Sequence, residues 1–256
     1  MRINRMFSFN VIAVSRITKY PDSPTVIFLP DSLGCIELWK DFPYRFGDLI
    51  HSNVLIYDRQ GHGNSCALSS PRNYNYLEQE ADILHELIKY WNLQEVCLFG
   101  HSDGGSIALV AAAKYPGLVK GLFVEAAHIF VEDLTIKGIK DAVELYRYSD
   151  LKIKLEKYHG KKTEDLFWAW ADTWTSSAFS SWDISHYLSS ITCPTLVIQG
   201  EEDDYGTLKQ VTGIAQGCAG YTEQLILPGV GHNPHREATE LTLELCSQFF
   251  LNQFDG

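Results

Sequence analysis

The sequence has no long apolar run, and this absence excludes a helix that would span a membrane. The apolar stretch at residues 7–14 is short and interrupted by Ser8 and Asn10, so we expect no signal peptide. The six cysteines form neither a C-x-x-C motif nor a cluster, which excludes a zinc ribbon and disfavours a disulfide framework. Free thiols in a reducing compartment and the missing signal predict a cytoplasmic protein.

Positive charge is also scarce. Lysine and arginine together number 21 against 32 aspartate and glutamate residues, which gives a formal net charge of −11. Such a chain gains nothing from the counterion release that drives nucleic-acid binding, and an anionic membrane repels it. We therefore expect neither nucleic acid nor a membrane as a partner. The glycines form neither G-x-G-x-x-G nor a P-loop, so we expect no cofactor.

Short, fully apolar runs alternate with helical stripes through the first half of the chain. Runs that are apolar at every position are typical of strands covered on both faces, as in a parallel sheet. Helical stripes show apolar residues three and four positions apart. The predicted strands lie at residues 7–17, 25–29, 53–57, 96–99 and 121–124, and the predicted helices at 83–91 and 106–115.

The alternation stops after Glu125. Residues 141–158 have helical spacing, and four of the six tryptophans crowd into residues 167–187. Predicted strands return at 195–199 and 223–227, followed by a helix at 239–250. We predict an α/β fold with a doubly wound, mostly parallel sheet. Its core would comprise residues 1–126 and 192–256, with a helical cap inserted at 127–191.

The strongest chemical signal is the hexapeptide GHSDGG at residues 100–105, between a predicted strand and an alanine-rich helix. In that context G-x-S-x-G is typical of a nucleophile elbow, because the glycines permit a sharp turn with the serine at its apex. The amides that begin the following helix favour negative charge at the same place. Ser102 is therefore the predicted nucleophile.

A serine hydroxyl needs a base to take its proton. The loop GVGHN at residues 229–233 follows the last predicted strand, and its glycines let the ring of His232 turn inward. His235 is the nearest competitor. These two histidines have no third ligand at a suitable spacing, so we predict no metal site.

An imidazole base needs a carboxylate that fixes its tautomer. Four carboxylates follow one another at residues 201–204, directly after a predicted strand. We favour Asp203 and place Asp204 second, while a solvated acidic turn accounts for the rest. Glu125, at the end of the preceding strand, is the other carboxylate that could reach the histidine.

The order serine, aspartate, histidine along the chain resembles that of the α/β-hydrolase family. The segment DRQGHGNS at residues 58–65 resembles the D-R-x-G-x-G-x-S loop of many members. The elbow, the helix end AAAKYP at 111–116 and the loop GHNPH at 231–235 are similar to the valacyclovir-hydrolase-like (biphenyl-hydrolase-like) branch. The resemblance covers essentially the whole chain and implies a serine hydrolase with a helical cap.

The oxyanion loop departs from the family, because PDSLG at residues 30–34 replaces the usual His-Gly. An oxyanion hole uses backbone N–H groups, so we assign it by position to the amides of Ser32 and Asp103. Asp31 is expected to bond to its local backbone, as aspartate often does in turns.

The side chain of Asp103 has two interpretations that stay open. In the branch that the chain resembles, the acid after the serine is associated with binding the α-amino group of amino-acid esters. Alternatively, Asp103 caps the helix that begins at the elbow. Within the aromatic cluster we select Trp168 and Trp174 as substrate-binding residues, and most other rings are expected to form the core of the cap.

The sequence thus predicts a serine hydrolase that cleaves a small, mostly apolar ester, including α-amino-acid esters, through an acyl-enzyme intermediate. Its acidic residues favour neutral or cationic substrates over anionic ones. Two alternatives remain, namely a carbon–carbon bond hydrolase of the same fold and a low-turnover ligand receptor that retains the triad. We expect a monomer or a homodimer.

Overall fold

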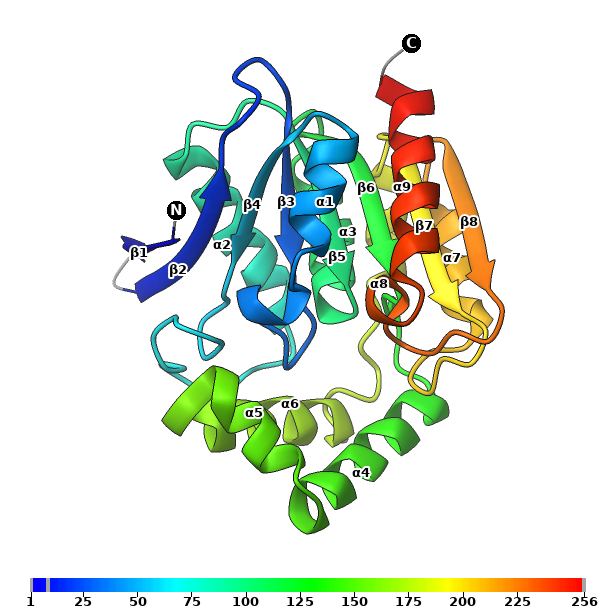
Figure 1. Cartoon of the computed structure of the whole chain (residues 1–256). Coiled ribbons are helices and arrows are strands. Elements are labelled where there is room, and N and C mark those ends of the chain that lie inside the picture. Colours follow the sequence, from blue (N-terminus) through cyan, green and yellow to red (C-terminus); the bar gives the residue numbers. More distant parts are fainter. Residues whose placement is uncertain (1, 8–9, 255–256) are drawn as a thin grey trace.

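The computed structural model describes residues 2–7 and 10–254, and within these residues eight strands form one sheet (Figure 1). The strand order is β1-β2-β4-β3-β5-β6-β7-β8. β2 is antiparallel to both β1 and β4, and all the other neighbours pair in parallel. The strands are β1 (Arg2–Phe7), β2 (Asn10–Ile17), β3 (Thr25–Leu29), β4 (Asn53–Tyr57), β5 (Val96–His101), β6 (Val119–Glu125), β7 (Thr195–Gly200) and β8 (Thr222–Leu227).

The predicted fold class, a doubly wound and mostly parallel α/β sheet, is confirmed. Strands β3 and β4 have the bounds that their apolar runs predict, because a run buried on both faces has no polar position inside it. Of the strand predicted at residues 7–17, residues 10–17 form β2, Phe7 ends β1, and residues 8 and 9 lie outside the described residues. The sequence analysis did not predict β1, which contains no continuous apolar run.

Helices cover both faces of the sheet. Successive strand side chains point to opposite faces, so Val26 and Phe28 pack in one hydrophobic cluster while Ile27 and Leu29 pack in the other. The first cluster lies under α1 (Phe42–Leu49) and α9 (Thr239–Phe254), which are in front of the sheet in Figure 1. The second lies under α2 (Tyr76–Tyr90), α3 (Asp103–Lys114) and α7 (Leu208–Gly217).

Three further helices lie beyond the C-terminal ends of the parallel strands, at the bottom of Figure 1. They are α4 (Asp133–Tyr148), α5 (Leu151–His159) and α6 (Thr163–Thr175). The single helix predicted at 141–158 is interrupted, because Ser149 has an extended backbone. These helices fall inside the predicted insertion at 127–191, whose boundaries remain a prediction. Residues 1, 255 and 256 of the predicted core lie outside the described residues.

Short elements complete the connections. They are the 3-10 helices η1 (Ile36–Trp39), η2 (Gly160–Lys162) and η3 (Ser185–Ser190) and the helix α8 (Pro234–Glu237). Across the described part of the chain, we find no helix with both the length and the apolar character that crossing a bilayer requires.

Candidate active site

Ser102 lies at the sharp turn between β5 and α3. Its φ of 54° and ψ of −119° place it in a region that residues other than glycine rarely occupy. Two glycines let the chain pass closely here. A Cβ added at Gly100 would lie 2.2 Å from the carbonyl oxygen of Gly104, and one added at Gly104 would lie 2.0 Å from that of Leu29. The turn therefore holds Ser102 at the C-terminal edge of the sheet, at the start of a helix.

His232 and Asp203 form a hydrogen-bonded pair. Nδ1 of His232 lies 2.8 Å from Oδ1 of Asp203, which also accepts the backbone N–H of Tyr205 at 2.8 Å. Burial alone would raise the pKa of Asp203, but the charge and hydrogen bond of His232 and the Tyr205 amide lower it below its usual value. An ionised Asp203 keeps the proton on Nδ1, which leaves Nε2 of His232 to act as a base.

The acidic turn supplies this partner from one of its four carboxylates. Asp203 is buried, whereas Glu201, Glu202 and Asp204 are exposed to solvent. The structure thus brings the favoured carboxylate, and not Asp204, to the ring of His232. The other three carboxylates form the solvated turn that was the alternative interpretation.

Glu125 and His235, which competed for these roles, bond to each other. Nδ1 of His235 lies 2.8 Å from Oε2 of Glu125, and both side chains are buried. With His101 they form the one group of three possible metal ligands found among the described residues. Hydrogen bonds to Glu125 and Asp31 already engage the two imidazoles, so we assign no ion to this group.

Ser102 and His232 line one cavity, which lies between the sheet edge and helices α4–α6. Its volume of about 330 Å³ is at the lower end of the range for small-molecule sites. The apolar part of its wall consists of Leu33, Ile139, Ala142, Leu145, Leu151, Trp170 and Trp174. A nucleophile and a general base therefore share one mostly apolar pocket.

The two tryptophans selected from the sequence lie in different places. Trp174 lines the cavity of Ser102 and donates its indole N–H to the hydroxyl of Tyr76 at 2.8 Å. Trp168 lines a separate cavity of about 700 Å³ beside residues 68–74, and its indole N–H donates to Glu164 at 2.9 Å. The structure does not bring Trp168 to the nucleophile.

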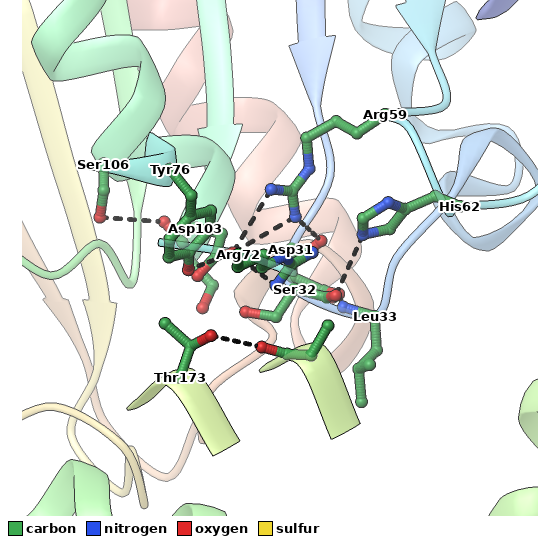
Figure 2. A network of polar contacts seen from close by, with 12 residues as sticks. Asp31, Ser32, Leu33, Arg59, His62, Arg72, Tyr76, Asp103, Ser106 and Thr173 are labelled. Carbon is green, nitrogen blue, oxygen red and sulfur yellow. Dashed lines mark hydrogen bonds and ion pairs between the residues drawn. The ribbon is translucent and has the colours of Figure 1, made fainter. Parts of the chain in front are cut away.

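Arg59 donates a hydrogen bond to the backbone segment proposed for the oxyanion hole (Figure 2). Nη2 of Arg59 donates to the carbonyl of Asp31 at 2.7 Å. The C=O and N–H of a trans peptide point in opposite directions, so the N–H of Ser32 is turned away from Arg59. Asp103 is the first residue of α3, and its N–H therefore has no intrahelical acceptor. Both Ser32 and Asp103 line the cavity.

The carboxylate of Asp103 has an environment that neither interpretation predicted. Its Oδ2 accepts a hydrogen bond from the hydroxyl of Tyr76 at 2.9 Å and from both Nη atoms of Arg59 at 3.4 Å. Nη1 of Arg72 lies 3.9 Å from the same oxygen (Figure 2). Two guanidinium groups thus compensate a carboxylate that is 1% exposed. Arg59 belongs to the loop at 58–65, whereas no sequence motif singles out Tyr76 or Arg72.

Asp31 and His101 join the oxyanion loop to the loop of the base. Oδ1 of Asp31 accepts the N–H of Leu33 at 2.8 Å, as expected for an aspartate in a turn, and its Oδ2 lies 3.3 Å from Nδ1 of His101. Nε2 of His101 donates to the carbonyl of His232 at 2.8 Å. Burial lowers the pKa of His101, but the bond to Asp31 and nearby negative charge raise it overall. No local sequence pattern links Asp31 to His101, and this contact was not predicted.

Comparison with known proteins identifies relatives of this chain. The model of a family described as the alpha/beta hydrolase family matches residues 26–245. The chain is 29% identical over 190 residues to the serine hydrolase BPHL of Homo sapiens and 32% identical over 193 residues to that of Mus musculus. Each match covers 70% of this chain, and the chain spans 62% of the length of each curated relative.

A solved structure is similar over nearly the whole chain. The crystal structure of a hydrolase from Pseudomonas aeruginosa PA01 matches with a TM-score of 0.75 and covers 97% of both chains. Its sequence is 17% identical, so this likeness concerns the fold alone.

Proposed function

The chain belongs to the alpha/beta hydrolase family, and on that premise we propose that it is a serine hydrolase of small, mostly apolar esters. The observation that carries the proposal is the cavity shared by Ser102 and His232, with Asp203 hydrogen-bonded to Nδ1 of the imidazole. The apolar wall and the volume of about 330 Å³ support a small substrate.

The proposed reaction uses each of these groups in turn. His232 takes the proton of Ser102 as the hydroxyl attacks the ester carbonyl, and Asp203 stabilises the imidazolium. The amides of Ser32 and Asp103 stabilise the oxyanion. His232 then gives the proton to the leaving alcohol, while the acyl group stays on Ser102. Water activated by His232 attacks the acyl-enzyme, releases the acid and restores the serine.

The pairing of Asp103 bears on the charge of the substrate. A free carboxylate beside the nucleophile would attract a cationic ester, but this carboxylate contacts Arg59 and Arg72. Its charge is therefore balanced inside the protein. We accordingly propose that the substituents next to the reacting carbonyl carbon are uncharged. This substrate class is narrower than the neutral or cationic esters expected from the sequence.

The setting of the protein is part of the same proposal. The six cysteines are free thiols, which supports a reducing, cytoplasmic compartment. The net charge of −11 supports a small molecule, and not nucleic acid or a membrane surface, as the partner.

Replacing the nucleophile tests the proposed function. We expect Ser102→Ala to lower the rate of p-nitrophenyl butyrate hydrolysis by at least about a thousandfold. A fluorophosphonate probe should label the wild type at Ser102 and leave this variant unlabelled. Ser180→Ala, which removes an exposed hydroxyl from a residue that does not line the cavity of Ser102, is the matched control and should keep full activity.

Two results would count against the proposal. Undiminished hydrolysis by Ser102→Ala would reject this serine as the nucleophile. A wild type that neither hydrolyses any ester nor reacts with the probe would favour a ligand receptor of the same fold.

A further inference from the structure

Two polar side chains in the wall of the cavity share one hydrogen-bond acceptor. Nε2 of His128 lies 3.0 Å from the carbonyl oxygen of Tyr205, and the hydroxyl of Thr135 donates to the same oxygen at 2.6 Å. Both side chains belong to residues that line the cavity of Ser102, and these residues are 3% and 2% exposed. The mechanism proposed above gives neither of them a role.

This shared carbonyl determines what His128 offers to a ligand. A carbonyl oxygen only accepts, so Nε2 of His128 carries the ring proton. Burial and the neighbouring His232 lower the pKa of His128, which keeps the ring neutral. Nδ1 therefore holds a lone pair, and within the described ranges it has no hydrogen-bond partner.

Thr135 has likewise already donated its proton. A threonine hydroxyl has one proton, and Thr135 donates it to Tyr205. Its oxygen can then offer only lone pairs to a ligand. The cavity thus has two side chains, His128 and Thr135, that act as acceptors and not as donors; we call them the acceptor pair.

The loop that carries Asp203 fixes the carbonyl to which both members of the acceptor pair donate their protons. The N–H groups of Tyr205 and Gly206 both donate to Oδ1 of Asp203, at 2.8 and 3.2 Å, which fixes the direction of the Tyr205 peptide. Two bonds fill both lone pairs of its carbonyl. Neither His128 nor Thr135 can turn its proton to a ligand without leaving this buried oxygen short of a partner.

We propose that the acceptor pair binds a neutral O–H or N–H group of the substrate, so that the preferred ester carries a hydroxyl or amide group near the scissile bond. The ring of His128 lies 6.2 Å from that of His232, which puts such a donor within a few bonds of the reacting carbonyl. Trp174, 5.4 Å from His128, provides an apolar neighbour that limits access of water. An ester without the donor leaves two buried acceptors unpaired.

This inference rests on the proposed function for the position of the ester, so its test measures binding and not turnover. In Ser102→Ala the fluorescence of Trp170 and Trp174, which line the cavity, reports Kd without hydrolysis. The probes are methyl butyrate, methyl 3-hydroxybutyrate, methyl 3-acetamidobutyrate and 2-hydroxyethyl butyrate. We expect at least one donor-bearing ester to bind five times or more tighter than methyl butyrate, and the four arms identify the donor and its side of the ester.

Variants of the acceptor pair show whether it causes the preference. In the same Ser102→Ala background, Thr135→Val keeps the shape but removes the oxygen, and His128→Phe removes the nitrogen. Each variant should reduce the ratio of the Kd of methyl butyrate to that of the donor-bearing ester at least threefold. His128→Gln supplies both an N–H for Tyr205 and an acceptor, and should retain part of it. Thr163→Val is the matched control, because Thr163 is buried and donates to a carbonyl outside the cavity.

The outcomes separate this inference from the proposed function. Equal Kd values for all four esters would overturn the acceptor pair, as would a preference that survives both Thr135→Val and His128→Phe. Neither result affects labelling of Ser102 by a fluorophosphonate. Conversely, a donor preference without labelling would support the acceptor pair and reject the serine hydrolase.

Discussion

Arg59 contacts both backbone segments that are proposed to form the oxyanion hole. It donates to the carbonyl of Asp31, in the peptide that carries the N–H of Ser32, and it pairs with the carboxylate of Asp103. The guanidinium is fully buried and reaches these oxygens with a rigid, planar fork. A lysine ammonium is a point charge that cannot present donors in the same geometry. Arg59 is therefore a positioning residue behind the reacting atoms.

At the residue scale, we predict that Arg59→Lys lowers kcat for p-nitrophenyl butyrate by about 10- to 100-fold with a smaller change in KM. The reason is that misplaced N–H donors weaken binding of the oxyanion more than binding of the ester. Steady-state kinetics with a thermal melt measures both activity and folding. Arg45→Lys, in an exposed ion pair with Glu240, is the control. An unchanged kcat in the folded Arg59→Lys variant would contradict this role.

At the element scale, the end of α5 and the start of α6 are bonded to two loops of the sheet. Nζ of Lys162 donates to the carbonyls of Gly63 and Ser65, each at 2.6 Å. His159 accepts the N–H of Gly63 and donates to the carbonyl of Leu33, each at 2.9 Å. Since Leu33 follows Ser32, these bonds link the helices over the cavity to the proposed oxyanion loop.

We therefore expect Lys162→Met to loosen helices α4–α6. The variant keeps most of the side-chain volume but leaves the carbonyls of Gly63 and Ser65 without their charged donor. Limited proteolysis should cut within residues 127–191 several times faster than in the wild type, and KM should rise. Lys161→Met, one residue earlier and exposed, is the control. Identical cleavage of the two variants would show that Lys162 does not hold these helices.

At the scale of the whole molecule, buried histidines couple stability to pH. Burial lowers the pKa values of His62, His128, His159 and His235 below the ordinary value of 6.5. The unfolded chain then binds more protons than the folded chain as the pH falls below 6.5, so stability decreases. His101 acts in the opposite sense, because its raised pKa contributes stability that is present below 6.5 and lost as the pH rises through the folded value.

Among the histidines, four lowered pKa values outweigh one raised value, so we predict a net loss of stability on acidification. Between pH 6.5 and 5 the free energy of unfolding should fall, by at most about 1.4 kcal/mol per pH unit for each net proton. Urea unfolding from pH 8 to 5 measures it. His159→Gln, whose amide can accept from Gly63 and donate to Leu33, should reduce the slope. Constant or rising stability toward pH 5 would contradict this account.

The sequence by itself determined the features that are encoded by neighbouring residues. The turn at Ser102 was predictable because the glycines that allow it lie within two positions of the serine. Strands β3 and β4 were predictable because burial on both faces requires an unbroken apolar run. The loops of His232 and Asp203 were predictable from their positions after strands, since parallel strands end at one edge of the sheet.

Only the tertiary structure decided which distant groups meet. Asp103 lies against Tyr76 and Arg59, which are 27 and 44 residues away, and no local pattern links them. Trp168 and Trp174 are similar in the sequence, yet of these two Trp174 lines the cavity of Ser102 and Trp168 lines another. Periodicity indicates that a side chain is buried, but the packing of whole elements determines which surface it meets, and so determines the charge and polarity of the site.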